Sequence, residues 1–165
     1  FLFGKLLGST TRLTIAEKLH RFLKPNMIPV TVDLFIPSKN IEEFMEWYEK
    51  EVGHFPLWCV PYKNVHEYDW INNAFLDRIR DDLFLDIAIY GMKREKGRNI
   101  YRVIEEGLME IGGLKTLISD NYFSEEEFWS IWDKENYEKI KSRTDPHNYF
   151  RDLYNKTCRA MLGKE

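Results

Sequence analysis

Two stretches of strict alternation constrain the fold of this chain most strongly. Residues 30–36 and 83–90 place apolar side chains at every second position. These positions are Val30, Val32, Leu34 and Ile36 in the first stretch and Leu83, Leu85, Ile87 and Ile89 in the second. A period of two residues is typical of a β-strand with one buried face. We therefore expect two strands, the first ended by Pro37 and the second by Gly91.

Apolar residues at helical spacing predict amphipathic helices next to these strands. The first covers about residues 41–52 and ends at Gly53, and the second covers about residues 100–111 and ends at Gly112. Asn40 with Glu43, and Ser124 with Glu127, have the form of a capping box at a helix start. Phe128, Trp129, Ile131 and Trp132 then pack the helix that follows Ser124.

Weaker patterns fill the rest of the chain. The further elements that we expect are a short helix over 13–23, an edge strand within 54–62, a connection over 63–82, a short strand within 114–119, and helices over 136–141 and 147–162. The two prolines that flank the apolar run Leu57–Val60 favour an edge strand or a strand interrupted by a bulge. This order lacks the regular alternation of a doubly wound nucleotide fold. It predicts an α+β fold, an antiparallel sheet flanked by helices with a C-terminal helical segment.

Composition narrows the classes of function. With 165 residues, the chain has the length of one domain. The 24 Lys and Arg against 27 Asp and Glu give a net charge of −3, which argues against a nucleic-acid partner. Cys59 and Cys158 are too far apart for a metal-finger spacing and are expected to be buried, reduced thiols. A cytoplasmic location follows, and no apolar run reaches the roughly 18 residues of a membrane span.

The sequence lacks the common motifs that identify a nucleotide-binding or catalytic site. The sequence has no glycine-rich dinucleotide loop, P-loop, His-Glu-x-x-His or Gly-x-Ser-x-Gly. The four histidines are scattered without ligand spacing, so no metal site is predicted.

Four groups of residues leave a structural and a functional interpretation open. Asp33 and Asp86 each interrupt an apolar strand, on the face that also carries Phe35, Phe84 and Tyr90. Either that face is partly wetted, or each aspartate caps a neighbouring backbone group, or the face lines a chamber for a ligand. Lys115 after Gly112-Gly113 is either a solvated lysine or a ligand contact. The aromatic residues Trp129, Trp132 and Tyr137 are either core or a stacking platform.

Several segments together resemble a known family. They are residues 55–61, 85–91, 119–123 with 126–129, and 145–158, and their order along the chain is preserved. They resemble the C-terminal part of the sterol reductases in the vanillyl-alcohol-oxidase superfamily of FAD-linked oxidoreductases. This resemblance implies a substrate or cap domain, an antiparallel sheet with helices that covers a flavin bound mainly by an upstream FAD-binding domain. Residues 1–26 are then a lead-in from that domain, and residues 27–165 are the cap domain. The start at Phe1 without a Met agrees with a chain cut after a flavin domain.

The resemblance also implies roles for particular residues. In related sugar-alcohol and aldonolactone oxidases, a His-Trp-Gly-Lys motif brings its lysine to the flavin, and Gly112-Gly113-Leu114-Lys115 looks like this motif without its His and Trp. Lys115, Asn121 and Tyr122 are therefore predicted to contact FAD. Trp58, Asp86 and Tyr90 are predicted to line the pocket for a small-molecule substrate, sterol-like or polyol-like. No catalytic base is assigned.

The family resemblance includes one further motif, and the sequence also leaves an alternative function open. Asp145-Pro146-His147-Asn148-Tyr149-Phe150 resembles the Asp-Pro-x-Gly-x-Phe signature of the family, with Asn148 where glycine is usual, and is expected to form a turn into the last helix. The alternative function is a non-catalytic α+β binding module, or a partner subunit of a separate flavoprotein. Membrane association stays open without a transmembrane segment.

Overall fold

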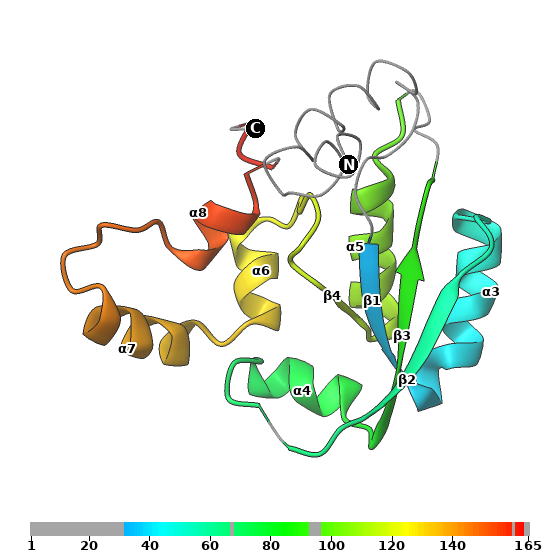
Figure 1. Ribbon diagram of the computed structural model, residues 1–165, viewed down its shortest axis with the longest axis horizontal. Coiled ribbons are helices and arrows are strands. Elements are labelled where there is room, and N and C mark those ends of the chain that lie inside the picture. Colours follow the sequence, from blue (N-terminus) through cyan, green and yellow to red (C-terminus); the bar gives the residue numbers. More distant parts are fainter. Residues whose placement is uncertain (1–31, 67, 93–96, 160, 164–165) are drawn as a thin grey trace, which may run out of the picture.

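The computed structural model describes residues 32–66, 68–92, 97–159 and 161–163. In this part of the chain, four strands form one antiparallel sheet in the order β2-β3-β1-β4. The strands are β1 (Val32–Pro37), β2 (Trp58–Lys63), β3 (Leu83–Ile89) and β4 (Leu114–Lys115). The predicted α+β fold with an antiparallel sheet and a helical C-terminal segment is confirmed (Figure 1). The helix expected over 13–23 and the domain boundary at residue 26 lie outside the described residues.

The register of the central strands decides which side chains share a face. Leu34 pairs with Ile87, and Phe35 pairs with Asp86. Since residues opposite one another point to the same side of a sheet, the alternating apolar residues of β1 and β3 gather on one face and the two aspartates on the other. The two predicted strands are therefore confirmed over the described residues, and residues 30 and 31 of the first prediction lie outside them. The strand with two prolines, β2, lies at the sheet edge as expected, because Pro61 has no N–H to offer a further strand.

Two helices cover the apolar face and form the first core. They are α3 (Ile41–Glu51) and α5 (Ile100–Ile111), and they lie behind the strands in Figure 1. The side chains that meet there are Val32, Leu34, Ile36, Phe44, Tyr48, Ile87, Ile89, Met92, Tyr101, Ile104 and Leu108. We call this side of the sheet the covered face. Gly107 of α5 lets the two helices approach closely, because a Cβ there would lie 2.2 Å from the Trp47 ring.

The remaining helices form a second core beside the sheet. These are α4 (Asn73–Ile79), α6 (Glu125–Ile131) and α8 (Leu153–Thr157), while α7 (Lys134–Thr144) buries no residue. Trp132 is buried in this core, and Trp129 packs against it and against the Tyr137 ring, 5.4 Å away. The core interpretation is therefore confirmed for Trp132, whereas Trp129 and Tyr137 are only partly buried.

The connection expected over 63–82 is wrong, because it contains α4. Asn72 caps this helix by accepting a hydrogen bond from the N–H of Ala74 at 3.0 Å. Phe75 and Ile79 are one helical turn apart and bury its inner side. The charged residues between Asp77 and Asp82 hid this short apolar stripe in the sequence.

The capping box at Asn40 is also wrong, whereas the one formed by Ser124 and Glu127 is confirmed. The Asn40 amide instead donates to the carbonyl oxygens of Ile111 and Gly112, each at 2.9 Å. A 3-10 turn, η1 (Ser38–Asn40), leads into α3 and leaves its start without a side-chain cap. Asn40 thus joins the start of α3 to the end of α5.

The C-terminal elements differ from expectation in length. The strand within 114–119 has only two residues, and the helix expected over 147–162 is limited to α8. The Asp145 carboxylate accepts the N–H groups of Tyr149 and Phe150 and so holds the turn that precedes α8. Asn148 adopts a φ of 53°, the left-handed region that glycine enters most easily, at the position where the family signature has glycine.

The two cysteines behave differently. Cys158 is buried as expected, but Cys59 is exposed, because β2 is the edge strand. No described helix combines the length and apolar character that crossing a membrane requires.

Candidate functional site

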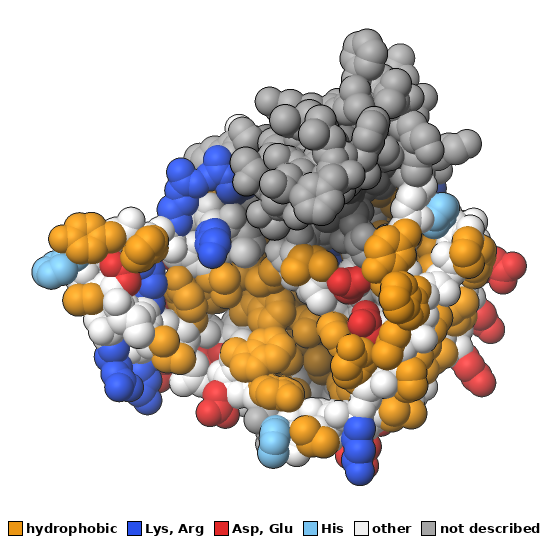
Figure 2. All heavy atoms as spheres, in the orientation of Figure 1, with side chains coloured by type: hydrophobic (Ala, Val, Ile, Leu, Met, Phe, Trp, Pro, Cys, Tyr) orange, Lys and Arg blue, Asp and Glu red, His pale blue; other side chains and the backbone are white. Residues whose placement is uncertain are grey.

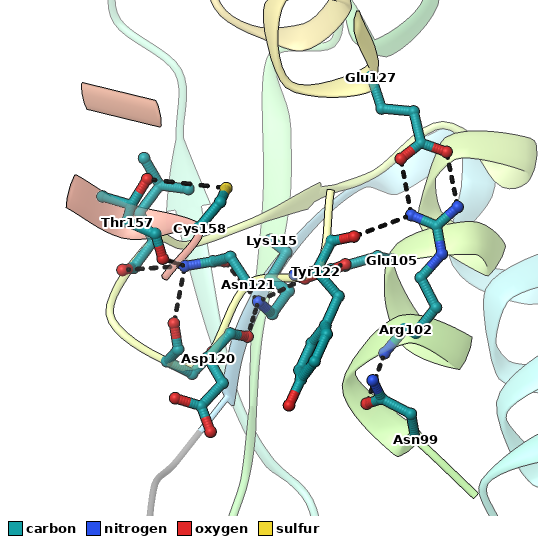
Figure 3. Close-up of polar contacts among 12 residues, drawn as sticks. Asn99, Arg102, Glu105, Lys115, Asp120, Asn121, Tyr122, Glu127, Thr157 and Cys158 are labelled. Atoms are coloured by element: carbon teal, nitrogen blue, oxygen red, sulfur yellow. Dashed lines mark hydrogen bonds and ion pairs between the residues drawn. The ribbon is translucent and has the colours of Figure 1, made fainter. Parts of the chain in front are cut away.

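Two of the residues predicted to bind the cofactor, Lys115 and Asn121, are buried in a polar network on the covered side of the sheet, which the backbone N–H of Tyr122 joins (Figure 3). Lys115 pairs with Leu34 across β4 and β1, so its side chain enters the core below the sheet. Its ammonium group donates to Oε1 of Glu105 at 2.9 Å, to the Asp120 carbonyl at 2.7 Å and to Oδ1 of Asn121 at 2.6 Å. An ammonium has three N–H groups, so this set of acceptors uses all of them.

The partners of Lys115 are equally occupied. Glu105 lies on α5 and also accepts the N–H of Tyr122 at 3.0 and 3.1 Å. The Asn121 amide nitrogen donates to the carbonyls of Ser119 at 2.7 Å and Thr157 at 3.1 Å. The segment after β4 is thereby fixed to α5 on one side and to α8 on the other.

Burial acts on both charges of the pair. It lowers the pKa of Lys115 and raises the pKa of Glu105, because each charged form loses its water. The contact between the two groups acts in the opposite direction on each pKa. With both side chains at 0% exposure, the pair is an internal salt bridge, and removal of either partner leaves an uncompensated polar group in the core.

A second ion pair connects α5 to α6 next to this network. Arg102 makes a two-pronged contact with Glu127, with N–O distances of 2.7 and 2.6 Å, and also contacts Glu106 at 2.8 Å. The hydrogen bonds from Arg102 are the largest influence that lowers the pKa of Glu127, to about 2. Glu127 also completes the capping box with Ser124, so one carboxylate starts α6 and ties it to α5.

These contacts bear directly on the predicted flavin site. As they lie in this structure, Lys115 and Asn121 use their side-chain N–H groups on acceptors within the chain, and Tyr122 stacks on Tyr101 with ring centroids 6.2 Å apart. In this arrangement the three residues do not fit a direct flavin contact. The two glycines before Lys115 also serve the chain itself, because a Cβ on Gly113 would lie 2.6 Å from Leu108. The assignment of these residues to FAD stays a prediction.

The residues predicted for the substrate pocket lie on the opposite side of the sheet, which we call the open face. Its members are Asp33, Phe35, Trp58, Val60, Tyr62, Phe84, Asp86, Ala88 and Tyr90. Trp58 pairs with Ala88, the neighbour of Asp86 on this face, and the Trp58 and Tyr90 rings lie 6.1 Å apart. Trp58, Asp86 and Tyr90 are therefore brought together on one surface.

Much of this surface is both apolar and accessible. Trp58 is 62% exposed, and Tyr62 and Tyr90 are each 49% exposed. Phe35 and Phe84, lower on the same face, pack against the second core. Figure 2 shows hydrophobic side chains gathered over the strands, with acidic side chains among them. A flat apolar ligand would find aromatic rings and carboxylates here, which is the composition of many small-molecule sites.

The two predicted groups of site residues are thus separated by the sheet. Lys115, Asn121 and Tyr122 lie on the covered side, and Trp58, Asp86 and Tyr90 lie on the open face. Sequence reasoning missed Glu105 and Arg102. For Glu105 a signal existed, because it follows Tyr101 by four residues and so falls within the apolar stripe of α5, where a carboxylate needs a partner. Arg102 carries no comparable signal, since it lies among other charged residues.

Comparison with known proteins now adds to this geometry. The chain is 25% identical over 166 residues to the human Delta(24)-sterol reductase, a match that covers 97% of the chain and 31% of that protein. A Delta(24)-sterol reductase homolog of Caenorhabditis elegans is 24% identical over 79% of the chain and 25% of its own length, and the Delta(24)-sterol reductase of Arabidopsis thaliana is 22% identical over 95% and 32%. The chain is similar to a C-terminal part of Delta(24)-sterol reductases.

This similarity confirms the resemblance to sterol reductases seen in the sequence. The chain spans about a third of the length of the curated relatives it matches. No family model matches it, and no solved structure does.

Proposed function

We propose that this chain is the substrate-binding C-terminal region, or cap domain, of an FAD-dependent oxidoreductase. In this proposal the open face lies against an organic substrate, sterol-like or polyol-like, while a hydride passes between the substrate and the flavin. The aromatic open face carries the proposal, because Trp58, Tyr62 and Tyr90 expose large apolar surfaces next to Asp86. The similarity to Delta(24)-sterol reductases over nearly the whole chain supports the oxidoreductase class.

The proposal assigns the binding of FAD mainly to an upstream FAD-binding domain. The chain has no phosphate-binding glycine loop, and its relatives are about three times as long as the matched part. The role of this chain's own residues is to hold an apolar substrate with Trp58 and Tyr90 and to exclude water from it. By itself, the chain is expected to bind FAD weakly and to be inactive. A cytoplasmic setting is also part of the proposal, and a peripheral contact with a membrane is compatible with it.

The test is to express the complete reading frame that contains these residues and to record its visible absorption after gel filtration. Bound flavin gives a yellow protein, and addition of a sterol with a side-chain double bond, after the flavin has been reduced chemically, is expected to give a reduced product. A protein without flavin absorption, even after incubation with excess FAD, would refute the oxidoreductase proposal. The same preparation with Lys115→Met tests the predicted flavin contact, and an unchanged rate of flavin reduction removes Lys115 from that role.

A second candidate is a binding module without catalytic activity, or a partner subunit of a separate flavoprotein. It is favoured by the internal hydrogen bonds of Lys115 and Asn121, which leave their side-chain N–H groups engaged within the chain. The two candidates differ in where the flavin is found. Under the second, the reading frame yields a colourless protein that binds a ligand on the open face.

A further inference from the structure

The turn between α7 and α8 presents two consecutive aromatic side chains to solvent. Tyr149 is 81% exposed and Phe150 is 76% exposed, the highest values among the large hydrophobic side chains that the structure describes. The His147 and Tyr149 rings lie 5.5 Å apart, and Ile140 of α7 is also exposed. Figure 1 places this turn at the end of the molecule, away from the sheet. We call residues 145–150 the aromatic turn, and neither core includes its rings.

Hydrogen bonds from behind hold the aromatic turn in place. The buried Asp145 carboxylate accepts the N–H of Tyr149 at 2.8 Å and the N–H of Phe150 at 3.0 Å. The Lys141 ammonium donates to the Phe150 carbonyl at 2.8 Å and also contacts Asp145. The two rings therefore project from a backbone that is already ordered. A partner that covers them pays little for ordering the turn, which favours binding.

The charge around the aromatic turn is opposite in sign to the charge of the whole chain. Residues 139–151 contain four Lys and Arg and one acidic residue, a net charge of +3, whereas the whole chain has a net charge of −3. Lys139, Arg143 and Arg151 are exposed, and none of them forms an ion pair among the described residues. Figure 2 shows hydrophobic side chains at this end of the molecule between two groups of Lys and Arg side chains. A partner that fits is therefore anionic and accepts apolar side chains.

An anionic membrane surface combines these two properties. Aromatic rings are favoured at the boundary between lipid head groups and acyl chains, where the ring is buried and a polar tip stays in water. Lys and Arg next to such rings are attracted to anionic head groups. A second copy of the chain fits less well, because contact between two aromatic turns would bring like charges together.

We propose that the aromatic turn is a membrane-contact site that places Tyr149 and Phe150 between the head groups of an anionic lipid surface. Arg143 and Arg151 contact the lipid phosphates in this arrangement, and the sheet stays outside the lipid. The inference goes beyond the proposed function, because it requires neither a flavin nor a ligand on the open face. Loss of this contact leaves the chemistry of that proposal unaffected.

The test is sedimentation of the 165-residue chain with lipid vesicles. One set contains phosphatidylcholine alone, and the other contains about one third phosphatidylserine. The chain is expected to bind the anionic vesicles and to be released by high salt, which screens exposed charges. Replacing both rings, by Tyr149→Ser with Phe150→Ser, is expected to weaken binding about tenfold. Circular dichroism checks that this variant folds, and Ile118→Ser, at an apolar side chain with 64% exposure elsewhere, is the control that keeps full binding.

A second pair of variants tests the charges separately from the rings. Arg143→Gln and Arg151→Gln are each expected to weaken binding to the anionic vesicles about fivefold. Neither is expected to change the weak binding to neutral vesicles. Lys63→Gln removes an exposed cation from β2 and is the matched control.

Each result supports or overturns the site. Absence of binding to both kinds of vesicle overturns it, and so does full binding by the variant without the two rings. A dimer that forms without lipid and is lost in Phe150→Ser assigns the turn to a second copy instead. Binding to polyglutamate but not to vesicles assigns it to an acidic protein. All of these outcomes leave the proposed function standing, because flavin binding and the open face are measured separately.

Discussion

The two faces of the sheet differ in the hydrogen bonding of their buried polar side chains. On the covered face, Lys115 and Glu105 are buried completely, and hydrogen bonds engage both of them. On the open face, Asp86 and Thr116 each have a buried side-chain oxygen that makes no hydrogen bond among the described residues, next to exposed aromatic rings. A fold can hold charges inside only where it supplies their partners. The Lys115 network therefore stabilises the fold, whereas ligand binding on the open face is part of the proposed function.

Among the variants that test this comparison, Lys115→Met is expected to change the free energy of unfolding most. Breaking a buried ion pair by removing one partner costs about 3–5 kcal/mol, because Glu105 then stays buried without its counter-charge. We expect a loss of this size in urea unfolding. The control is Lys50→Met, since Lys50 pairs with Glu51 at 3.4 Å but is 82% exposed. A loss below about 1 kcal/mol in Lys115→Met would contradict the stabilising role of the network.

The position of Lys115 also shows where sequence reasoning stops. The alternation in β1 and β3 predicted both strands and placed Asp33 and Asp86 on one face. The sheet side that Lys115 faces depends on the register of β4, a two-residue strand whose shift by one residue would reverse it. No periodicity can be read from so short a strand. The carboxylate that binds Lys115 comes from a helix ten residues earlier, and only packing brings the two together.

The open face was more accessible to prediction, for a physical reason. Trp58, Asp86 and Tyr90 belong to strands whose pairing places neighbouring alternate residues on one surface, so strand assignment alone implied their proximity. α4 was missed because the polar residues around Phe75 and Ile79 dominate its sequence.

A second test addresses how tightly the covered face is packed. Gly107→Ala should lower the free energy of unfolding by about 1–3 kcal/mol, because the added Cβ lies 2.2 Å from the Trp47 ring where α3 meets α5. In an open helix the same change is stabilising by up to roughly 1 kcal/mol. Thermal unfolding of Gly107→Ala with and without Trp47→Leu checks the cause. A stabilised single variant, or no relief in the double variant, would contradict the close approach of the helices.

A third test uses pH to compare Glu127 with Asp86. The pKa of Glu127 is lowered from its usual 4.5 to about 2, so its contribution to stability is full above pH 4.5 and is lost as the pH falls toward 2. Glu127→Gln should flatten acid unfolding in this window and cost about 1–2 kcal/mol at neutral pH. The pKa of Asp86 is raised, so Asp86→Asn should remove a loss of stability that sets in as the pH rises above 3.8. Identical pH profiles for the two variants would contradict the assignment of opposite roles.

The smallest effect on stability, and the sharpest separation of the two faces, is expected for Trp58→Thr. Trp58 is 62% exposed on an edge strand, so its replacement by another strand-forming residue should change the free energy of unfolding by less than about 0.5 kcal/mol. If the open face holds a ligand, the same change should weaken binding of a sterol by about tenfold, because the ring supplies exposed aromatic surface beside Tyr90. Met161→Thr, at a comparably exposed apolar residue outside the sheet, should alter neither quantity.

Since Trp58→Thr removes the ring that would report binding by fluorescence, equilibrium dialysis with a radiolabelled sterol is the measurement. Unchanged affinity would remove Trp58 from the ligand face, whereas a stability loss above about 1 kcal/mol would show that the open face also supports the fold.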